Sequence, residues 1–498
     1  MWLLPSGLML LLGAWGIRRQ GAVWRDEAVT YDMAHRGLAD LWATLQHVDV
    51  VHGVYYALMH VWFRLYDATL GGAFGGALDG VFGAAVGLRL PSVAAMTAAA
   101  AGVALLGRRL VGPRAGLLAG LVFALIPLVQ QYAQEGRSYA AVCALVIWAG
   151  YVLVRAAARP RRRLWAAYTA LMLCACLLHE FACLALPAHG AAVVLARLPR
   201  RVLRAWALCA AAVFAGLAPL AVYSTRQSAQ LSWLLWPDPG QLLTFAALAA
   251  LGLACAHVCV RARVSSRGPI GLRALAVPLL LLPTLLLFLL SHLEPAYVDR
   301  YVLYYVAGFA LLAGAALARL LRPAGEHGQT RARRLRRTLA VALALAALLP
   351  VTVRLRSPDS RVDDVTAVAR AVRETAEPGD GLLFMPSRRR IWMATRPDDF
   401  RGLDDLALAQ SPVASHTLYG TEVSGDAIRD RMLAARRIIV AGDPADQPTD
   451  DTDQEIAKRA TLRDAFEACG SREVRGARVT VYARPGACGV ARTGDRAG

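Results

Sequence analysis

The chain has 498 residues, of which 57% are hydrophobic and only 18% are charged, and its formal net charge is +19. Because the surface of a soluble protein must offer polar groups to water, a chain of this size cannot bury so large an apolar fraction. The composition therefore excludes an ordinary soluble protein and predicts a multi-pass α-helical membrane protein.

The positive charge is confined to one part of the chain. Residues 1–353 contain 32 Lys and Arg against 13 Asp and Glu, whereas residues 354–498 contain 23 of each. The basic residues of the first part occur in short clusters between apolar runs, which is typical of membrane orientation. This pattern argues against a nucleic-acid partner and predicts membrane lipids as the surroundings, despite a pI near 10.1.

Eleven apolar segments are predicted to be membrane helices. The first, 2–17, follows no basic segment and precedes no small-residue cleavage site, which favours a retained helix over a removed signal peptide. Several of the others are 15–17 residues long, at the lower limit for crossing a bilayer of about 30 Å. These others are 91–107, 115–131, 139–154, 164–178, 181–196, 205–222, 241–260, 274–290, 302–318 and 338–353.

Joining these segments in order creates two sets of loops. One set of five carries 23 arginines, and the opposite set carries nine basic residues, so the arginine-rich loops are predicted to be cytoplasmic. Arg18 and Arg19 are exceptions on the outer side. An odd number of spans also places residues 354–498 outside the cytoplasm. The five loops are 108–114, 155–163, 197–204, 261–273 and 319–337.

Two parts outside the membrane are long enough to fold. Within the domain 1–353, residues 18–90 mix tryptophans and tyrosines with charges, which predicts interfacial helices in a first outer loop. Residues 354–484 alternate amphipathic stretches with two short apolar runs, 381–385 and 437–441, which predicts a small extracytoplasmic α/β domain. Residues 485–498 are predicted to be a flexible tail.

Two of the nine cysteines, Cys469 and Cys488, fall in this last part of the chain. An extracytoplasmic location would allow them to form a disulfide, although the sequence alone does not decide whether they pair.

The first outer loop carries the acidic residues best suited to catalysis. Asp26 and Glu27 follow Arg25 directly, and either carboxylate could take a proton from a bound hydroxyl. The alternative is that Asp26 caps a helix by accepting hydrogen bonds from free backbone N–H groups. Further along, Asp49 is a third candidate catalytic carboxylate, and Arg25 and His52 are candidates for binding the donor phosphate or the sugar. A metal site of His47, Asp49 and His52 is a less favoured alternative, since their spacing fits no regular helix face.

Other polar residues are expected at the outer ends of later helices. Candidates for binding a sugar or a phosphate are Gln134, Glu135, Arg137 and Tyr139 between two spans, and Arg300 with Tyr301 before the tenth. An arginine forms two-point hydrogen bonds with phosphate, so Arg300 is a candidate for an anionic head group, with an ion pair to Asp299 as the alternative. His179 and Glu180 lie in a very short outer turn.

Five short motifs occur in a fixed order along residues 1–320. Together they resemble bacterial GT-C glycosyltransferases of family 39, which are related to protein O-mannosyltransferases and the lipid A aminoarabinose transferase. One departure is His52-Gly53-Val54, where relatives often have Pro-Pro-Leu, and it concerns acceptor specificity. The motifs are Trp24-Arg25-Asp26-Glu27-Ala28, Asp49 followed by Tyr55-Tyr56, Leu88-Arg89-Leu90-Pro91-Ser92, Tyr132-Ala133-Gln134-Glu135 with Arg137-Ser138-Tyr139, and Asp299-Arg300-Tyr301.

The resemblance implies a GT-C-like fold, a polyprenyl-phosphate sugar donor, an extracytoplasmic active site and a catalytic aspartate at Asp26. It suggests mannose as the first choice of sugar and a glycan, lipid or protein as the acceptor. An inverting transfer needs a carboxylate base and a cation beside the leaving phosphate, and needs neither a metal nor another cofactor.

Two other functions fit parts of the sequence. A non-catalytic transporter of polyprenyl lipids or solutes would place charges inside the helices and repeat one half of the fold, whereas the charges here gather in outer loops. A receptor or scaffold would explain residues 354–498 but not the acidic first loop. The sequence therefore favours the glycosyltransferase.

Overall fold

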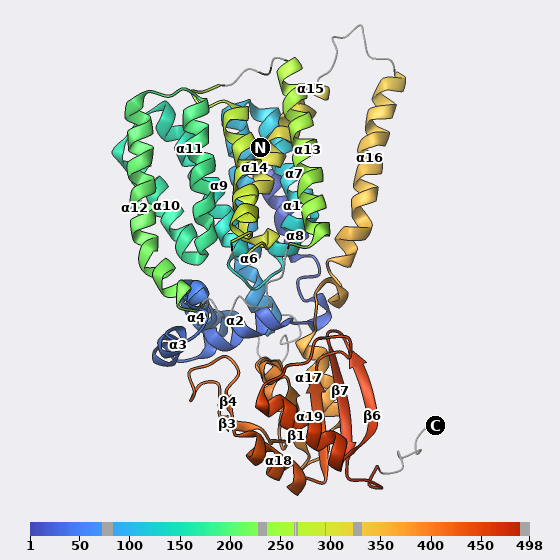
Figure 1. The fold of residues 1–498 in the computed structure, drawn as a ribbon. Coiled ribbons are helices and arrows are strands. Elements are labelled where there is room, and N and C mark those ends of the chain that lie inside the picture. Colours follow the sequence, from blue (N-terminus) through green and yellow to red (C-terminus); the bar gives the residue numbers. More distant parts are fainter. Residues whose placement is uncertain are drawn as a thin grey trace. The chain divides into compact units, whose positions relative to one another are not determined.

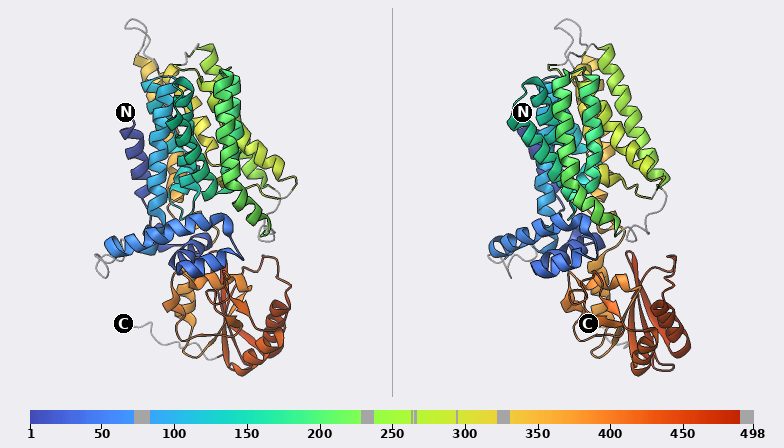
Figure 2. Two further views of the ribbon diagram at one scale, coloured as in Figure 1. Left: turned by 90° about the vertical axis from the view of Figure 1, so that its left-hand side faces the viewer. Right: turned by 60° about the vertical axis from the view of Figure 1, so that its left-hand side comes forward.

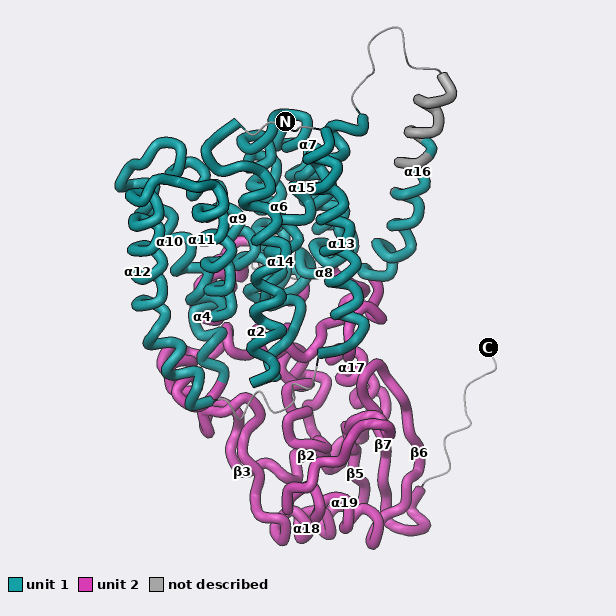
Figure 3. The backbone as a smooth tube through the Cα atoms, turned by 45° about the horizontal axis from the view of Figure 1, so that its top comes forward, with its two compact units in different colours: residues 1–17, 49–55, 86–356 teal, residues 18–48, 56–85, 357–498 magenta. Residues whose placement is uncertain are grey.

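The computed structural model describes residues 1–71, 83–227, 237–262, 264, 267–293, 295–321 and 331–488. Parts of four predicted segments lie outside these residues: 72–82 of the first outer loop, 263 and 265–266 of the loop 261–273, 322–330 of the arginine-rich connector and 489–498 of the tail. The chain divides into two compact units (Figure 3), and each is described by itself. Unit 1 comprises residues 1–17, 49–55 and 86–356, and unit 2 comprises 18–48, 56–85 and 357–498.

Unit 1 is built from helices that run side by side (Figures 1 and 2). All eleven predicted spans coincide with helical segments, because each is an apolar run without a helix-breaking cluster. The helices are α1 (Leu3–Ala14), α6 (Ala84–Leu110), α7 (Pro113–Leu125), α8 (Pro127–Ala133), α9 (Tyr139–Ala158), α10 (Arg162–Leu178), α11 (Ala185–Leu195), α12 (Arg200–Thr225), α13 (Pro239–Arg261), α14 (Leu272–Leu290), α15 (Tyr305–Leu320) and α16 (Arg331–Arg354).

The lengths of these helices confirm a multi-pass membrane protein. Among the described residues, five helices are both long and apolar enough to cross a membrane, namely α6, α9, α12, α13 and α14. Helices α7 and α8 would together make a sixth, although they meet at an angle of 66°. Pro127 begins α8 and has no N–H to continue the hydrogen bonds of α7, which explains the break. Eleven crossings therefore remain a prediction.

Helix α15 packs closely against α7, α13 and α14. At Gly314, an added Cβ would lie 2.3 Å from the backbone nitrogen of Ala119 in α7. At Gly308, it would lie 2.5 Å from the carbonyl oxygen of Ala276 in α14. Only glycine allows backbones to approach this closely, as is common between helices in membranes. The two glycines therefore fix the distance of α15 from its neighbours on two sides.

Unit 2 contains the predicted α/β domain. Its five-stranded sheet has the order β2-β1-β5-β7-β6, in which β2, β1 and β5 are parallel and β5, β7 and β6 are antiparallel. Both predicted apolar runs form adjacent strands, with Gly381 beside Ile438 and Met385 beside Gly442. The strands are β1 (Gly381–Met385), β2 (Asp404–Asp405), β5 (Arg437–Gly442), β6 (Glu467–Val474) and β7 (Ala477–Ala483), and a separate pair is formed by β3 (Leu408–Gln410) and β4 (Thr421–Glu422).

Helices cover both faces of this sheet (Figure 1). Because alternate residues of a strand point to opposite faces, Leu383, Ile438 and Val440 share one face, where they pack against α18 (Gly425–Ala434) and α19 (Asp453–Ala465). Helix α17 (Val365–Thr375) contacts β5, β6 and β7. The core of unit 2 therefore has one layer on each side of the sheet.

A buried charge network joins three parts of unit 2. The ammonium group of Lys458 on α19 is fully buried and donates to the carboxylates of Glu422 and Glu455, at 2.8 and 2.7 Å, and to the carbonyl oxygen of Phe384, at 3.1 Å. Glu422 also accepts from Arg390, at 2.9 Å. Burial raises the pKa of Glu455, and the charge of Lys458 opposes this shift. Every charge in the network therefore has an opposite charge beside it, as burial requires.

Unit 2 also contains most of the first outer loop. Its helices are α2 (Arg25–His35), α3 (Leu38–Leu45) and α4 (Gly53–Tyr66), whose first three residues belong to unit 1. Large apolar side chains are exposed on α3 and α4, including Trp42 at 68% and Leu58 and Val61 at 55%. Exposed apolar residues at helical spacing fit the predicted interfacial helices.

The structure settles whether the two cysteines of this part of the chain pair, which the sequence left open. Cys469 on β6 and Cys488 form a disulfide with their Cα atoms 5.2 Å apart. The bond closes the end of the described chain onto the edge strand of the sheet.

Candidate functional site

In unit 1, breaks between helices bring polar and aromatic side chains together around His179. This residue lies between α10 and the short helix η4 (Glu180–Leu184). Its ring lies 4.5 Å from that of Tyr301 in η6 (Asp299–Val302), 5.6 Å from that of Tyr139 and 5.8 Å from that of His52 in η2 (Val50–His52). The cluster thus joins four segments that are remote in sequence.

Two arginines bring positive charge to this cluster. The Nε atom of Arg300 donates to the hydroxyl of Tyr139 at 3.2 Å, and its guanidinium lies within 6 Å of the rings of Tyr139 and Tyr301. Arg137 lies in the turn between α8 and α9 and is 7% exposed. The electrostatic influence of both arginines extends to His179. The arrangement can therefore hold an anion in a largely dry setting, where charge interactions are strong.

His179 is held neutral by its surroundings. Burial is the main cause that lowers its pKa well below the usual value, followed by the charges of His52, Arg137 and Arg300, whereas Asp49 acts in the opposite sense. Its Nδ1 atom is buried and has no hydrogen-bond partner within the described part of the chain. A neutral imidazole can donate to or accept from a ligand.

Asp49 lies beside this cluster and orients His52. Its Oδ1 atom is 2.7 Å from Nδ1 of His52, and its backbone has a φ of 58°, which is uncommon for a residue other than glycine. A carboxylate paired with an imidazole can accept a proton, so Asp49 remains chemically suited to catalysis. Among the described residues, no three His, Cys, Asp or Glu side chains are placed to hold a metal ion.

Gln134 and Glu135 contribute mainly to the frame of the site. The side-chain amide of Gln134 donates to the carbonyl oxygens of Gly13 and Trp15, at 2.8 and 2.6 Å, which ties the end of α8 to the end of α1. The backbone oxygen of Glu135 accepts from the hydroxyl of Ser92 at 2.5 Å. These contacts fix the turn that carries Arg137.

Unit 2 contains the other three predicted site residues, which all lie in the first turn of α2. Glu27 is fully buried and pairs with Arg19 at 2.8 Å. The backbone N–H of Arg25 donates to the carboxylate of Asp363 at 3.0 Å, and its side chain lies 3.8 Å from the same carboxylate. The contacts of Arg25 hold the start of α2 on the α/β domain, and the buried ion pair gives Glu27 a structural role.

Asp26 is placed differently from Glu27. It is partly exposed, and it is close enough to the buried Asp363 to help raise the pKa of that carboxyl, for which burial is the main cause. The interpretation of Asp26 as a helix cap is wrong, because α2 begins at Arg25 and its N-cap residue is Trp24, without a side-chain capping bond.

Sequence reasoning missed the central position of His179. Its short turn gave no spacing signature, and two of its partners, His52 and Tyr301, lie more than 100 residues away from it along the chain. The sequence did contain a useful signal. An ionisable side chain between two membrane segments costs free energy, so a histidine in that position indicates a functional role.

Part of the chain matches a known family. Residues 76–223 match the family model of the dolichyl-phosphate-mannose-protein mannosyltransferases, and this range includes Arg137, Tyr139 and His179. No curated protein matches the chain.

Several solved structures have a similar fold. ArnT from Cupriavidus metallidurans in the apo state has a TM-score of 0.58 at 15% identity, covering 96% of this chain and 97% of that one. ArnT bound to undecaprenyl phosphate gives 0.57, with the same identity and coverage. Archaeal oligosaccharyltransferase AglB from Archaeoglobus fulgidus, in complex with an inhibitory peptide and a dolichol-phosphate, gives 0.50 at 11% identity, covering 88% of this chain and 69% of that one.

The sequence motifs, the fold and the family match thus agree. The predicted resemblance to GT-C glycosyltransferases is confirmed, and the chain has an ArnT-like GT-C fold.

Proposed function

We propose that the protein is an inverting glycosyltransferase that moves a sugar, with mannose as the first candidate, from a polyprenyl phosphate to an acceptor hydroxyl. The reaction takes place on the extracytoplasmic side, and the acceptor is a glycan, a lipid or a protein. The family match and the binding of undecaprenyl phosphate by ArnT support the choice of donor.

In this proposal, the cluster around His179 binds the donor phosphate. Arg300 and Arg137 supply the charge, and Tyr139 and His179 supply neutral hydrogen-bonding groups. Fixed donors of this kind need no reorganisation when negative charge grows on the leaving group, so they stabilise the transition state more than the bound donor.

Asp26 is the proposed general base, and Asp49 is the second candidate. The oxygen of the acceptor hydroxyl attacks the anomeric carbon, and its proton passes to the carboxylate. The bond from the anomeric carbon to the phosphate oxygen breaks, and its electron pair leaves with the lipid phosphate. Attack from the opposite face inverts the configuration.

The observation that supports the proposal is the partly buried contact of Arg300 with Tyr139 beside His179. The test is transfer from a radiolabelled polyprenyl-phosphate mannose to membrane acceptors by the purified chain in lipid nanodiscs. Arg300→Gln should lower the rate by about 10²–10³, because it removes a charge that stabilises the leaving phosphate.

Arg155→Gln is the matched control, since this exposed arginine also lies over a tyrosine ring, Tyr151, at 5.8 Å. It should leave transfer unchanged. Equal rates for Arg300→Gln and the control would contradict the proposed phosphate site. If the unmodified chain transfers no sugar from mannosyl or arabinosyl donors, the proposed reaction itself is wrong.

A further inference from the structure

The α/β domain of unit 2 contains a cavity of about 400 Å³ that the proposed transfer reaction does not use. It opens where the parallel strands β1 and β5 end, at Met385 and Gly442, which is where α/β sheets commonly bind ligands. Its volume falls within the ~300–1,000 Å³ usual for small-molecule sites.

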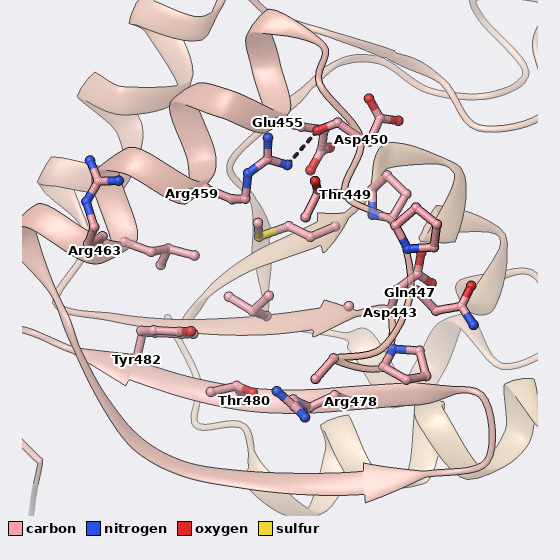
Figure 4. A pocket seen from close by; sticks show the side chains of 18 of the residues that line it. Asp443, Gln447, Thr449, Asp450, Glu455, Arg459, Arg463, Arg478, Thr480 and Tyr482 are labelled. Atoms are coloured by element: carbon pink, nitrogen blue, oxygen red, sulfur yellow. Dashed lines mark hydrogen bonds between the residues drawn. The ribbon is translucent and has the colours of Figure 1, made fainter.

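Three different elements contribute polar side chains to the lining of the cavity (Figure 4). Arg478, Thr480 and Tyr482 alternate along β7, so all three point to the same face of the sheet. Helix α19 contributes Arg459 and Arg463, and the loop after β5 contributes Gln447, Thr449 and Asp450. Polar groups therefore converge on one space from a strand, a helix and a loop.

The charges around this cavity already have partners. Arg459 lies 3.3 Å from Asp451 and donates to the backbone oxygen of Asp450 at 2.5 Å. Arg463 pairs with Asp464 at 2.9 Å, and Arg478 pairs with Glu473. Each paired carboxylate offsets part of the positive charge that would attract an anionic ligand, so the lining is suited to a neutral ligand.

Each of the carboxylates that line the cavity likewise has a basic partner. Asp443 pairs with Arg389 and with Arg388, and Asp450 also reaches Arg388, at 3.4 Å. Glu455 pairs with Lys458 at 2.7 Å. A cationic ligand therefore gains little here as well.

The remaining surface is apolar, and it includes Val440, Leu462, Phe466 and the proline rings of the loop after β5. A ligand that fits must present hydroxyls on its edge and C–H groups on its face, and a pyranose or furanose ring has this combination. We propose that this cavity is a second, non-catalytic binding site for a neutral saccharide. The inference goes beyond the transfer reaction, because it requires neither the donor nor a catalytic carboxylate.

Equilibrium binding to the full chain in lipid nanodiscs tests the proposal. Maltoside and glucoside detergents must be excluded, since their head groups are sugars. The probes are methyl α-mannoside, methyl β-galactoside and mannobiose, followed by saturation-transfer NMR. At least one should bind saturably with a Kd of ~1 mM, as expected for a small polar ligand.

The variant Arg478→Gln should weaken this binding about tenfold through loss of a charge-assisted hydrogen bond. Arg472→Gln is the matched control, because Arg472 lies on the paired strand β6 and pairs with Glu374 of α17, away from the cavity. Gln447→Ala, in the loop, is a second cavity variant that does not alter the sheet. Thermal melting of each variant checks that it is folded.

Three results would overturn the proposal: no saturable binding of any probe, equal affinities for Arg478→Gln and Arg472→Gln, or tighter binding of mannose 6-phosphate than of methyl α-mannoside. None of these results depends on sugar transfer. Failure of this inference is therefore distinguishable from failure of the proposed function.

Discussion

Adjacent carboxylates in the first turn of α2 have very different surroundings. Glu27 is sealed into an ion pair with Arg19, whereas Asp26 is partly exposed. A base must reach a substrate, so burial argues for Asp26 as the reacting group and for Glu27 as a support.

We expect Asp26→Asn to abolish sugar transfer in a folded protein. Asparagine is nearly isosteric with aspartate but cannot accept the acceptor's proton, and loss of a general base typically costs ~10²–10⁴ in rate. The measurement is transfer from a polyprenyl-phosphate sugar, with protein level determined in parallel. Near-normal turnover of Asp26→Asn, together with inactive Asp49→Asn, would move the assignment to Asp49.

Glu27→Gln should act mainly on stability. Removing one partner of a buried ion pair takes away the carboxylate that lies 2.8 Å from the buried guanidinium of Arg19, and such a loss typically costs about 3–5 kcal/mol. Chemical denaturation of the purified chain, followed by tryptophan fluorescence, measures this loss. A variant of normal stability that has lost transfer would instead point to a catalytic role for Glu27.

The buried imidazole of His179 should make stability fall in acid. Because its pKa is lowered in the folded state from a usual value of 6.5, the folded protein binds fewer protons than the unfolded one. The free energy of unfolding is therefore unaffected by this group above pH 6.5. Below pH 6.5 it falls by up to about 1.4 kcal/mol per pH unit, because the unfolded chain takes up a proton that the folded protein does not.

Melting temperatures between pH 5 and pH 8 test this effect. His179→Gln should flatten the decline below pH 6.5 relative to the unmodified chain. Parallel declines in both proteins would show that another group is responsible.

At the scale of elements, the sequence predicted the long apolar helices and the two central strands well. Those patterns depend on neighbouring residues only, such as the run Gly381–Met385 that became β1. It missed the break between α7 and α8, although Pro127 gave a local signal. The strands β2 and β4 have two residues each, which is too short to show a periodicity in the sequence. They are recognised only by their pairing with β1 and β3.

The candidate site was predictable only in part, for a related reason. Arg300, Arg137 and Asp49 were recognised as charges near membrane helices, which is a property of each residue. The contact of Tyr139 with Arg300 spans 161 residues, and no spacing rule anticipates it. His179 was missed because its importance arises from such contacts.

The disulfide is expected to stabilise the hairpin of β6 and β7. It closes a short loop, with a sequence separation of 19 between the cysteines, and such cross-links contribute about 3 kcal/mol in the chain-entropy account. Cys469→Ser with Cys488→Ser should lower the melting temperature of the α/β domain, whereas Cys174→Ser, at an exposed thiol, should not.

Thiol counting offers a direct check of this pair. The denatured, unreduced protein should show seven reactive thiols, which correspond to the seven free cysteines. A count of nine would exclude the bond.

At the scale of the whole molecule, orientation in the membrane depends on the arginine-rich loops. They hold 23 of the 32 basic residues in positions 1–353, so we expect these loops to face the cytoplasm. A cysteine introduced at Arg333 should escape thiol reagents that do not enter intact cells, and it should react after the membrane is permeabilised. Strong labelling of intact cells would reverse the topology and move the proposed active site to the other side.

The charge network in the α/β domain has a practical consequence for chemical labelling. The chain contains 54 arginines and a single lysine, Lys458, whose side chain is fully buried. An ammonium group directs its donors in three directions, as Glu422, Glu455 and the carbonyl of Phe384 require, whereas a planar guanidinium does not. In the folded protein, no lysine side chain is therefore accessible to amine-selective acylating reagents. Acylation of Lys458 would then measure the fraction of molecules in which this domain has opened.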